Sequence, residues 1–184
     1  MNRRKRETPI PQHPHAVSAD VRRLVVSGVL VSLAVVLSIV ERWIPLNLLI
    51  PVPGIKLGLA NIVTLFAIYR LGFLDAAAIV VVRCLLSALF LGPASLLFSL
   101  FGGLAALGVM ALLHLGEGRA FSIYGISMAG AAAHNVGQVA AACLILRDLS
   151  LVTSYLPMLL LVGLLTGVPT AAATAPVLRR LKRI

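Results

Sequence analysis

The segment from Leu24 to Ile44 reads LVVSGVLVSLAVVLSIVERWI, a long apolar run that predicts a membrane-spanning helix. From Leu24 to Val40 it contains no charged residue. A helix needs about 20 mostly apolar residues to cross the hydrocarbon core of a bilayer. The whole chain has a similar character, with 60% hydrophobic residues and a mean hydropathy of +1.02, against roughly 45–50% apolar residues in soluble domains. We therefore expect an integral membrane protein.

Apolar segments of this kind recur along the rest of the chain. We expect membrane-spanning helices at Leu24–Ile44, Lys56–Leu71, Phe73–Leu91, Ala94–Leu115, Ile126–Leu146 and Leu156–Leu178, of which the second is short. The connections between them leave no room for a soluble catalytic lobe. The predicted fold is therefore an all-α, polytopic bundle of six transmembrane helices in one domain at residues 21–184, preceded by a disordered basic arm at residues 1–20.

The formal net charge of +10 points to the membrane surface rather than to nucleic acid, because of where the charges lie. An even number of spans puts both ends of the chain on one side, and the positive-inside rule makes the basic side cytoplasmic. The basic residues assigned to that side are Arg3, Arg4, Lys5, Arg6, Arg22, Arg23, Arg70, Arg119, Arg179, Arg180, Lys182 and Arg183, against Arg42, Lys56 and Arg147 outside. The expected location is a bacterial-type cytoplasmic membrane with both termini in the cytoplasm.

Small residues four positions apart mark the first predicted span. They are Gly28 with Ser32 and Ala34 with Ser38. Such stripes let helix backbones approach closely, either inside the bundle or at a docking face for another subunit. Cys84 and Cys143 also lie within spans, where we expect packing rather than a disulfide.

The stretch from Pro45 to Gly58 is rich in proline and glycine, so a helix cannot simply continue through it. One interpretation is an ordinary outer loop. The other is a structured loop, from Pro53 to Asn61, that folds over the bundle and covers a binding pocket.

Arg83 is the clearest polar residue at membrane depth. A charge there costs roughly 2.5–3.5 kcal/mol on insertion scales, so it is expected to have a partner or a function. A purely structural role would need a carboxylate, and only Glu41 and Asp75 are near enough in the predicted arrangement. The alternative is that Arg83 faces a ligand.

A second polar group follows in the fifth span. His134 and Gln138 are four residues apart and share a helix face, with Asn135 beside them. Together with Arg83 and with Lys56 and Asn61 near the loop, they form the predicted substrate site. A metal site is not expected, because His134 has no second ligand at a suitable spacing in its helix.

The acidic residues exclude one class of enzyme. The chain has six of them and no two are neighbours: Glu7, Asp20, Glu41, Asp75, Glu117 and Asp148. Prenyl diphosphate chemistry with Mg²⁺ needs clustered carboxylates to hold the metal. A phosphate-binding Gly-x-x-x-x-Gly-Lys-Ser/Thr loop is also absent, so ATP would be used only through partner subunits. We expect neither an enzyme nor a resident cofactor.

The run Pro53-Gly54-Ile55-Lys56-Leu57-Gly58-Leu59-Ala60-Asn61-Ile62 resembles the signature of the Gx transporter family, whose members are also described as heptaprenyl diphosphate synthase component I. Further matching segments are Arg83 followed by Gly92-Pro93, Ser99–Gly103, and Gly125-Ile126-Ser127 leading to Ala133–Gln138. The resemblance covers roughly residues 24–180. It implies a fold similar to the substrate-binding S components of energy-coupling factor (ECF) transporters.

The combined prediction is a membrane protein that captures a small molecule from the outer side. By resemblance, ECF transmembrane and ATPase subunits would energise uptake, with the stripe on the first helix as their docking face. The alternative is a non-catalytic accessory subunit of heptaprenyl diphosphate or menaquinone synthesis. A scaffold without any ligand is a third interpretation, which the interior polar residues disfavour.

Overall fold

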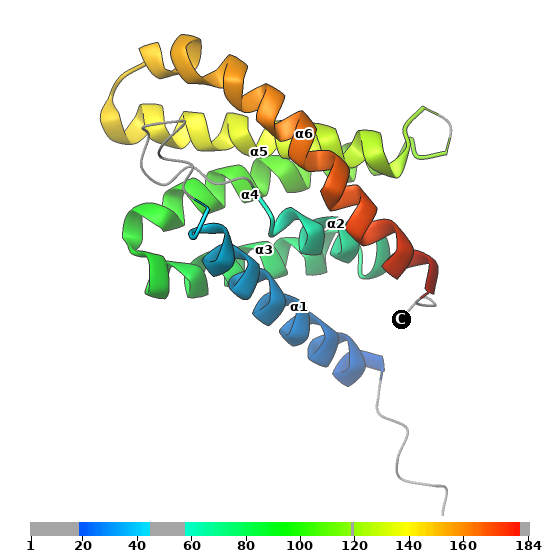
Figure 1. Cartoon of the computed structure of the whole chain (residues 1–184). Helices are drawn as coiled ribbons and strands as arrows, with labels where there is room; N and C mark the ends of the chain where they lie inside the picture. Colours follow the sequence, from blue (N-terminus) through cyan, green and yellow to red (C-terminus); the bar gives the residue numbers. More distant parts are fainter. Residues whose placement is uncertain (1–18, 45–57, 119, 181–184) are drawn as a thin grey trace, which may run out of the picture.

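The computed structural model describes residues 19–44, 58–118 and 120–180, and it is helical almost throughout. Figure 1 shows the bundle. The helices are α1 (Ala19–Glu41), α2 (Asn61–Arg70), α3 (Phe73–Leu91), α4 (Pro93–His114), α5 (Ile123–Leu146) and α6 (Ser150–Arg180). No β-strand occurs in these residues. The predicted all-α class is therefore confirmed.

Five of these helices are long and apolar enough to cross a membrane: α1, α3, α4, α5 and α6. The observed α3 has the predicted bounds, whereas α6 begins at Ser150 rather than at Leu156. This earlier start has a local cause, because the Ser150 N–H donates to Asp148 Oδ1 at 2.9 Å and the carboxylate caps the helix. The chain is thus a multi-pass helical membrane protein.

Helix α2 differs from the predicted second span, because it has only 10 residues. At 1.5 Å per residue it is about 15 Å long, roughly half the thickness of a bilayer's hydrocarbon core. Its start follows Gly58, whose φ of 84° lies in the left-handed region that favours glycine. Lys56 and most of the predicted covering loop lie outside the described residues. Six complete spans are therefore not established by the helices alone.

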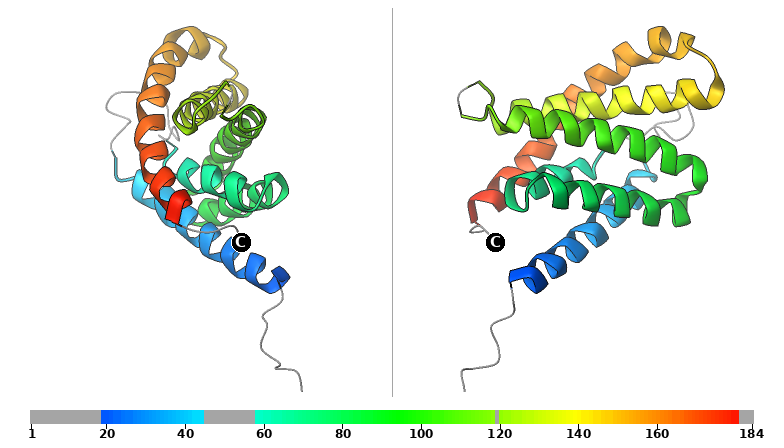
Figure 2. Two further views of the ribbon diagram at one scale, coloured as in Figure 1. Left: turned by 90° about the vertical axis from the view of Figure 1, so that its right-hand side faces the viewer. Right: turned by 180° about the vertical axis from the view of Figure 1, so that it is seen from behind.

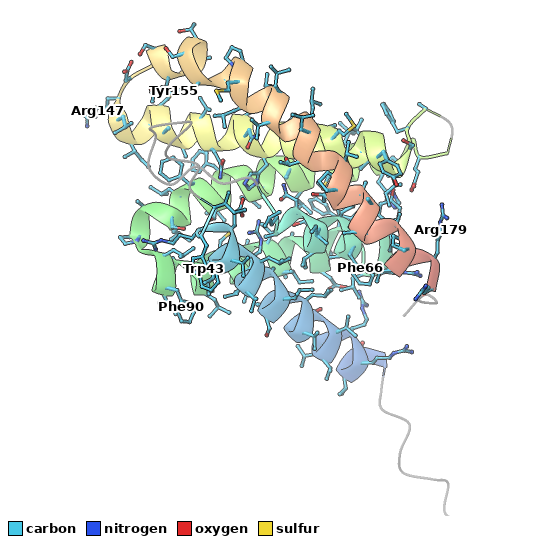
Figure 3. The ribbon with its side chains drawn as sticks, viewed as in Figure 1. Trp43, Phe66, Phe90, Arg147, Tyr155 and Arg179 are labelled. Atoms are coloured by element: carbon cyan, nitrogen blue, oxygen red, sulfur yellow. The ribbon has the colours of Figure 1, made fainter. Side chains whose placement is uncertain are left out.

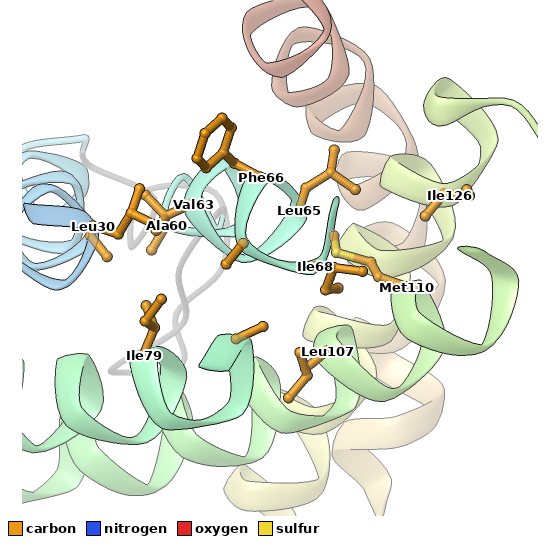
Figure 4. Packing of buried hydrophobic residues seen from close by; sticks show 13 residues of the cluster. Leu30, Ala60, Val63, Leu65, Phe66, Ile68, Ile79, Leu107, Met110 and Ile126 are labelled. Atoms are coloured by element: carbon orange, nitrogen blue, oxygen red, sulfur yellow. The ribbon is translucent and has the colours of Figure 1, made fainter. Parts of the chain in front are cut away.

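The short helix α2 lies at the centre of the bundle and contacts all five other helices. Most of its residues are buried: Asn61, Val63, Thr64, Leu65, Phe66, Ala67 and Ile68. Its apolar members pack with Leu30 of α1, Ile79 of α3 and Leu107 of α4 in the main hydrophobic core (Figure 4). Because every neighbour packs on α2, the position of its first turn is determined by the whole bundle.

Contacts at one end of the bundle tie the two ends of the described chain together. Arg23 of α1 forms an ion pair with Asp75 of α3 at 2.5 Å, and Arg70 of α2 donates to the carbonyl of Leu178 in α6. We call this end, which carries the start of α1 and the end of α6, the terminal end. Both views in Figure 2 agree with this arrangement. The described helices thus place the start of α1 and the end of α6 at the same end of the bundle.

The same end carries a small polar network. The rings of Tyr69 and His114 lie 4.2 Å apart, and His114 Nδ1 is 3.0 Å from Glu117 Oε2. Nearby, a surface depression of about 410 Å³ is lined by Glu117, Gly118, Ala120, Phe121 and Ser122. The network joins the end of α2 to the end of α4 and so fixes α2 along its axis.

The outer surface of the bundle is apolar, as expected for contact with lipid. Leu24 is 73% exposed, Leu89 79% and Leu165 72%. The aromatic side chains of Trp43 and Phe90, labelled in Figure 3, are also exposed. The two cysteines, Cys84 and Cys143, are buried and not joined by a disulfide, in agreement with the predicted packing role.

Candidate functional site

Six buried polar side chains lie on α2 and on two helices that pack against it. They come from three helices: Asn61 and Thr64 of α2, Arg83 and Ser87 of α3, and His134 and Gln138 of α5. We call these six residues the interior polar cluster. None is more than 3% exposed, although each belongs to a helix packed within an apolar bundle. A burial of this kind needs hydrogen-bond partners or a functional reason.

Glycines bring Asn61, His134 and Gln138 together. A Cβ atom on Gly58 would lie 2.7 Å from Asn61 Nδ2 and 3.1 Å from His134 Cδ2. A Cβ atom on Gly102 of α4 would lie 2.8 Å from His134 Cε1 and 3.0 Å from Gln138 Cγ. The missing side chains at these glycines therefore leave the space that the polar groups occupy. The predicted shared face of His134 and Gln138 is directed towards α4 and the start of α2.

Arg83 packs against α4 at the residue next to the one that contacts His134. A Cβ atom on Gly103 would lie 2.8 Å from Arg83 Nη2. Because Gly102 and Gly103 are consecutive, the guanidinium and the His134 ring lie at the same level of α4. The structure thus brings Arg83, His134, Gln138 and Asn61, four of the predicted site residues, to one region.

Each of the two carboxylates considered as structural partners for Arg83 has a contact elsewhere. Asp75 pairs with Arg23, and Glu41 accepts a hydrogen bond from the N–H of Gly58. Within the described part of the chain, Arg83 Nε and Nη2 have no hydrogen-bond partner. A guanidinium at 3% exposure with two nitrogens lacking partners is costly, so a ligand contact for Arg83 stays a prediction that the burial favours.

Three further members of the cluster have polar atoms without a partner among the described residues. They are the amide Oδ1 and Nδ2 of Asn61, the hydroxyl of Thr64 and the hydroxyl of Ser87. A buried polar atom left without a hydrogen bond costs about 1–3 kcal/mol. Several such atoms in one region are typical of a site that is completed by a ligand or by water.

Asn135 is directed away from this region. Its Nδ2 donates to the carbonyl of Leu159 in α6 at 2.6 Å, and a Cβ atom on Gly163 would lie 2.8 Å from the same nitrogen. The side chain therefore joins α5 to α6. A contact between Asn135 and a substrate remains a prediction, as does one from Lys56, which lies outside the described residues.

The four small residues of α1 do not share one environment. A Cβ atom on Gly28 would have no atom within 4 Å, and Ser32 is exposed. In contrast, Ala34 is 0% exposed and Ser38 is 2% exposed, and both face the interior. A partner docking on the outside of α1 would therefore meet Gly28 and Ser32 but not Ala34 and Ser38.

The acidic and metal-ligating side chains are dispersed. In the described residues no three His, Cys, Asp or Glu side chains come together in a group able to hold a metal ion. The interior polar cluster contains one imidazole, one guanidinium and several amide and hydroxyl groups, which suit the recognition of a polar ligand.

A comparison with protein-family models matches residues 30–177 to heptaprenyl diphosphate synthase component I. The chain belongs to this family. This match confirms the family resemblance noted at Pro53–Ile62, under the description heptaprenyl diphosphate synthase component I. No curated protein and no solved structure gives a match. In this component I family member, all six residues of the interior polar cluster lie within the matched residues 30–177.

Sequence reasoning did not select Ser87 or Thr64 of this component I protein as site residues. A signal for Ser87 was available, because it is four residues after Arg83 and so shares its helix face. Thr64 is three residues after Asn61 and follows the same rule. Gly102 and Gly103 lie in the Ser99–Gly103 segment of the family resemblance, but their contacts depend on how closely α4 approaches α3 and α5.

Proposed function

We propose that this chain is a non-catalytic membrane component of heptaprenyl diphosphate synthesis that acts together with a separate catalytic subunit. The observation that carries the proposal is the dispersal of the acidic residues in a member of the component I family. Chain elongation of a prenyl diphosphate requires clustered carboxylates that hold Mg²⁺ on the diphosphate. A partner must supply them.

Four of the described carboxylates are each engaged in a different place. Glu41 binds the N–H of Gly58, Asp75 pairs with Arg23, and Glu117 contacts His114. Asp148 caps α6, and hydrogen bonds from Ser150 hold the pKa of its carboxyl group below the usual range. These four residues therefore serve local structural contacts, which supports a binding or anchoring role over catalysis.

The membrane arrangement supports such a role. A heptaprenyl chain is a long hydrocarbon with an anionic head, so its synthesis ends with a product that partitions into lipid. We place the protein in a bacterial-type cytoplasmic membrane with both termini in the cytoplasm, because most of its basic residues lie near the two ends of the chain. A cytoplasmic catalytic subunit would then meet the bundle at its terminal end.

Reconstitution tests this function. The chain is co-expressed with the catalytic prenyl diphosphate synthase subunit of the same organism, and membranes are assayed for heptaprenyl diphosphate formed from isopentenyl diphosphate. We expect the two proteins to copurify and the seven-unit product to require both. A catalytic subunit that makes the same product at the same rate alone, and that does not copurify, would contradict the proposal.

Uptake of a small molecule, in the manner of an ECF S component, is the second candidate. It is favoured by the exposed pair Gly28 and Ser32 on α1, together with an interior polar cluster. ATP would be hydrolysed only by the partner ATPase subunits. If this candidate holds, Ser32→Leu abolishes copurification with ECF subunits while Ser32→Ala is tolerated; equal recovery of both variants speaks against docking at this face.

A further inference from the structure

The first turn of α2 lies inside the bundle rather than at its surface. Asn61 is 1% exposed, and Ala60 before it provides no side-chain cap. The first three N–H groups of α2 donate to backbone carbonyls just before or at the helix start, so the turn would contribute its dipole rather than free N–H groups. The N-terminus of a helix carries a partial positive charge and favours anions. In membrane proteins, short helices that start at bilayer depth direct this end towards the anionic groups of bound substrates.

A second and independent observation is Arg83 of α3, whose Nη2 lies 2.8 Å from a Cβ atom placed on Gly103, the residue after the Gly102 that packs against His134. Arg83 is 3% exposed, and its Nε and Nη2 have no partner among the described residues. Ser87, four residues along the same face of α3, and Thr64, in the first turns of α2, each carry a buried hydroxyl without a partner there. The guanidinium of Arg83 can only donate hydrogen bonds and carries a full positive charge, while each of the two hydroxyls can donate one hydrogen bond.

We propose that these groups form a binding site for the diphosphate head of a prenyl diphosphate, with Arg83 as the principal anion contact and Asn61, Thr64 and Ser87 as additional donors. A diphosphate offers acceptor oxygens in every direction and carries no obligatory donor, which matches this set. Arginine binds phosphate oxygens through two N–H groups at once. The choice of a prenyl diphosphate as ligand rests on the proposed function, whereas the choice of an anion rests on the cluster itself.

The nearby carboxylate is compatible with this site. Glu41 is 2% exposed, and one of its oxygens accepts the N–H of Gly58. It thus holds the turn that leads into α2. A ligand anion at Arg83 would supply a counter-charge to the guanidinium.

Binding to the purified full-length protein in lipid nanodiscs tests the site. The probes are farnesyl diphosphate, farnesol, inorganic diphosphate and phosphatidylglycerol, and the measurement is the ligand-induced shift in the melting temperature together with a titration of affinity. We expect a saturable shift with farnesyl diphosphate, competition by inorganic diphosphate and no shift with farnesol. Binding of farnesol alone, or a shift reproduced by phosphatidylglycerol, would overturn the proposal.

Substitutions at the cluster give a result that a purely structural role would not produce. Arg83→Met and Thr64→Val remove a charge or a hydroxyl that has no partner among the described residues, so the protein without ligand should melt at the same temperature or higher. Affinity for farnesyl diphosphate should fall by about tenfold or more for Arg83→Met. Arg179→Gln, an exposed residue at the end of α6, removes one positive charge as the matched control and should leave affinity unchanged.

The outcomes separate this site from the proposed function. Diphosphate binding that is lost in Arg83→Met, without any effect of the chain on a catalytic subunit, would support the site and contradict the role in synthesis. A functional complex whose affinity for the diphosphate is unaltered by Arg83→Met and Thr64→Val would contradict the site alone. Should Arg83→Met fail to fold, the affinity of Thr64→Val for farnesyl diphosphate and the comparison of farnesyl diphosphate with farnesol still test the site.

Discussion

Gly137 of α5 packs directly against the backbone of Phe101 in α4. A Cβ atom at position 137 would lie 2.4 Å from the Phe101 carbonyl oxygen and 2.9 Å from the Cα atom of Gly102. These neighbours are backbone atoms, so they cannot move aside as the end of a side chain can. The close approach of α4 and α5, which places His134 beside Gly102, therefore depends on the absence of a side chain at 137.

We expect Gly137→Ala to destabilise the bundle, because the added methyl group forces α4 and α5 apart. Overpacking of this kind typically costs about 1–3 kcal/mol. The measurement is the thermal unfolding of the purified protein in detergent. Gly108→Ala is the matched control, since nothing lies within 4 Å of a Cβ atom there. Equal melting temperatures for the two variants would mean that α4 and α5 are not in backbone contact at this point.

The neighbouring residues His134 and Asn135 should separate binding from stability. Asn135→Ala removes the hydrogen bond to Leu159 and should lower unfolding stability by about 1 kcal/mol while leaving ligand affinity nearly unchanged. The His134 ring packs between Gly58 and Gly102, next to Asn61 of the proposed site, so His134→Ala should weaken binding of farnesyl diphosphate by about tenfold with a smaller effect on the protein without ligand. Isothermal titration and thermal unfolding of both variants test this pair. If Asn135→Ala weakened ligand binding and His134→Ala mainly lowered stability, the site would lie on the α6 side of α5.

The ion pair between Arg23 and Asp75 should contribute little. The two side chains are 51% and 30% exposed, and exposed pairs typically contribute about 0–1 kcal/mol. We therefore expect Asp75→Asn to lower the melting temperature only slightly, and less at high salt because ions screen the pair. A large, salt-independent loss of stability would show instead that this contact is essential to the terminal end.

The orientation in the membrane can be tested by labelling single cysteines in a variant whose Cys84 and Cys143 are replaced by alanine. Leu149 lies between α5 and α6, and Ala120 lies between α4 and α5 at the terminal end; both are exposed. With both termini in the cytoplasm, a membrane-impermeant maleimide should label Leu149→Cys in intact cells and Ala120→Cys only after lysis. The reverse pattern would invert the topology.

The sequence predicts the helices well wherever length and apolar character are decisive, as the unchanged bounds of α3 illustrate. It also indicates Arg83 and His134, because polar residues stand out in an apolar segment. It indicates that the second segment is short, but not that α2 has only 10 residues and lies at the centre, since this depends on contacts with five other helices. Nor does it separate Asn135 from His134, because adjacent residues differ by about 100° around a helix and only packing shows which neighbour each one meets.

The shortness of α2 has a consequence for how the protein is made. Even the predicted segment Lys56–Leu71 falls below the about 20 apolar residues by which a helix enters the bilayer by itself. Insertion of α2 should therefore follow its neighbours in the chain, α1 and α3, rather than precede them. The Arg70 contact to the Leu178 carbonyl forms only once α6 has been synthesised. Completion of the polar interior is thus coupled to the last stage of translation, and a chain that stops before α6 leaves α2 without its final support.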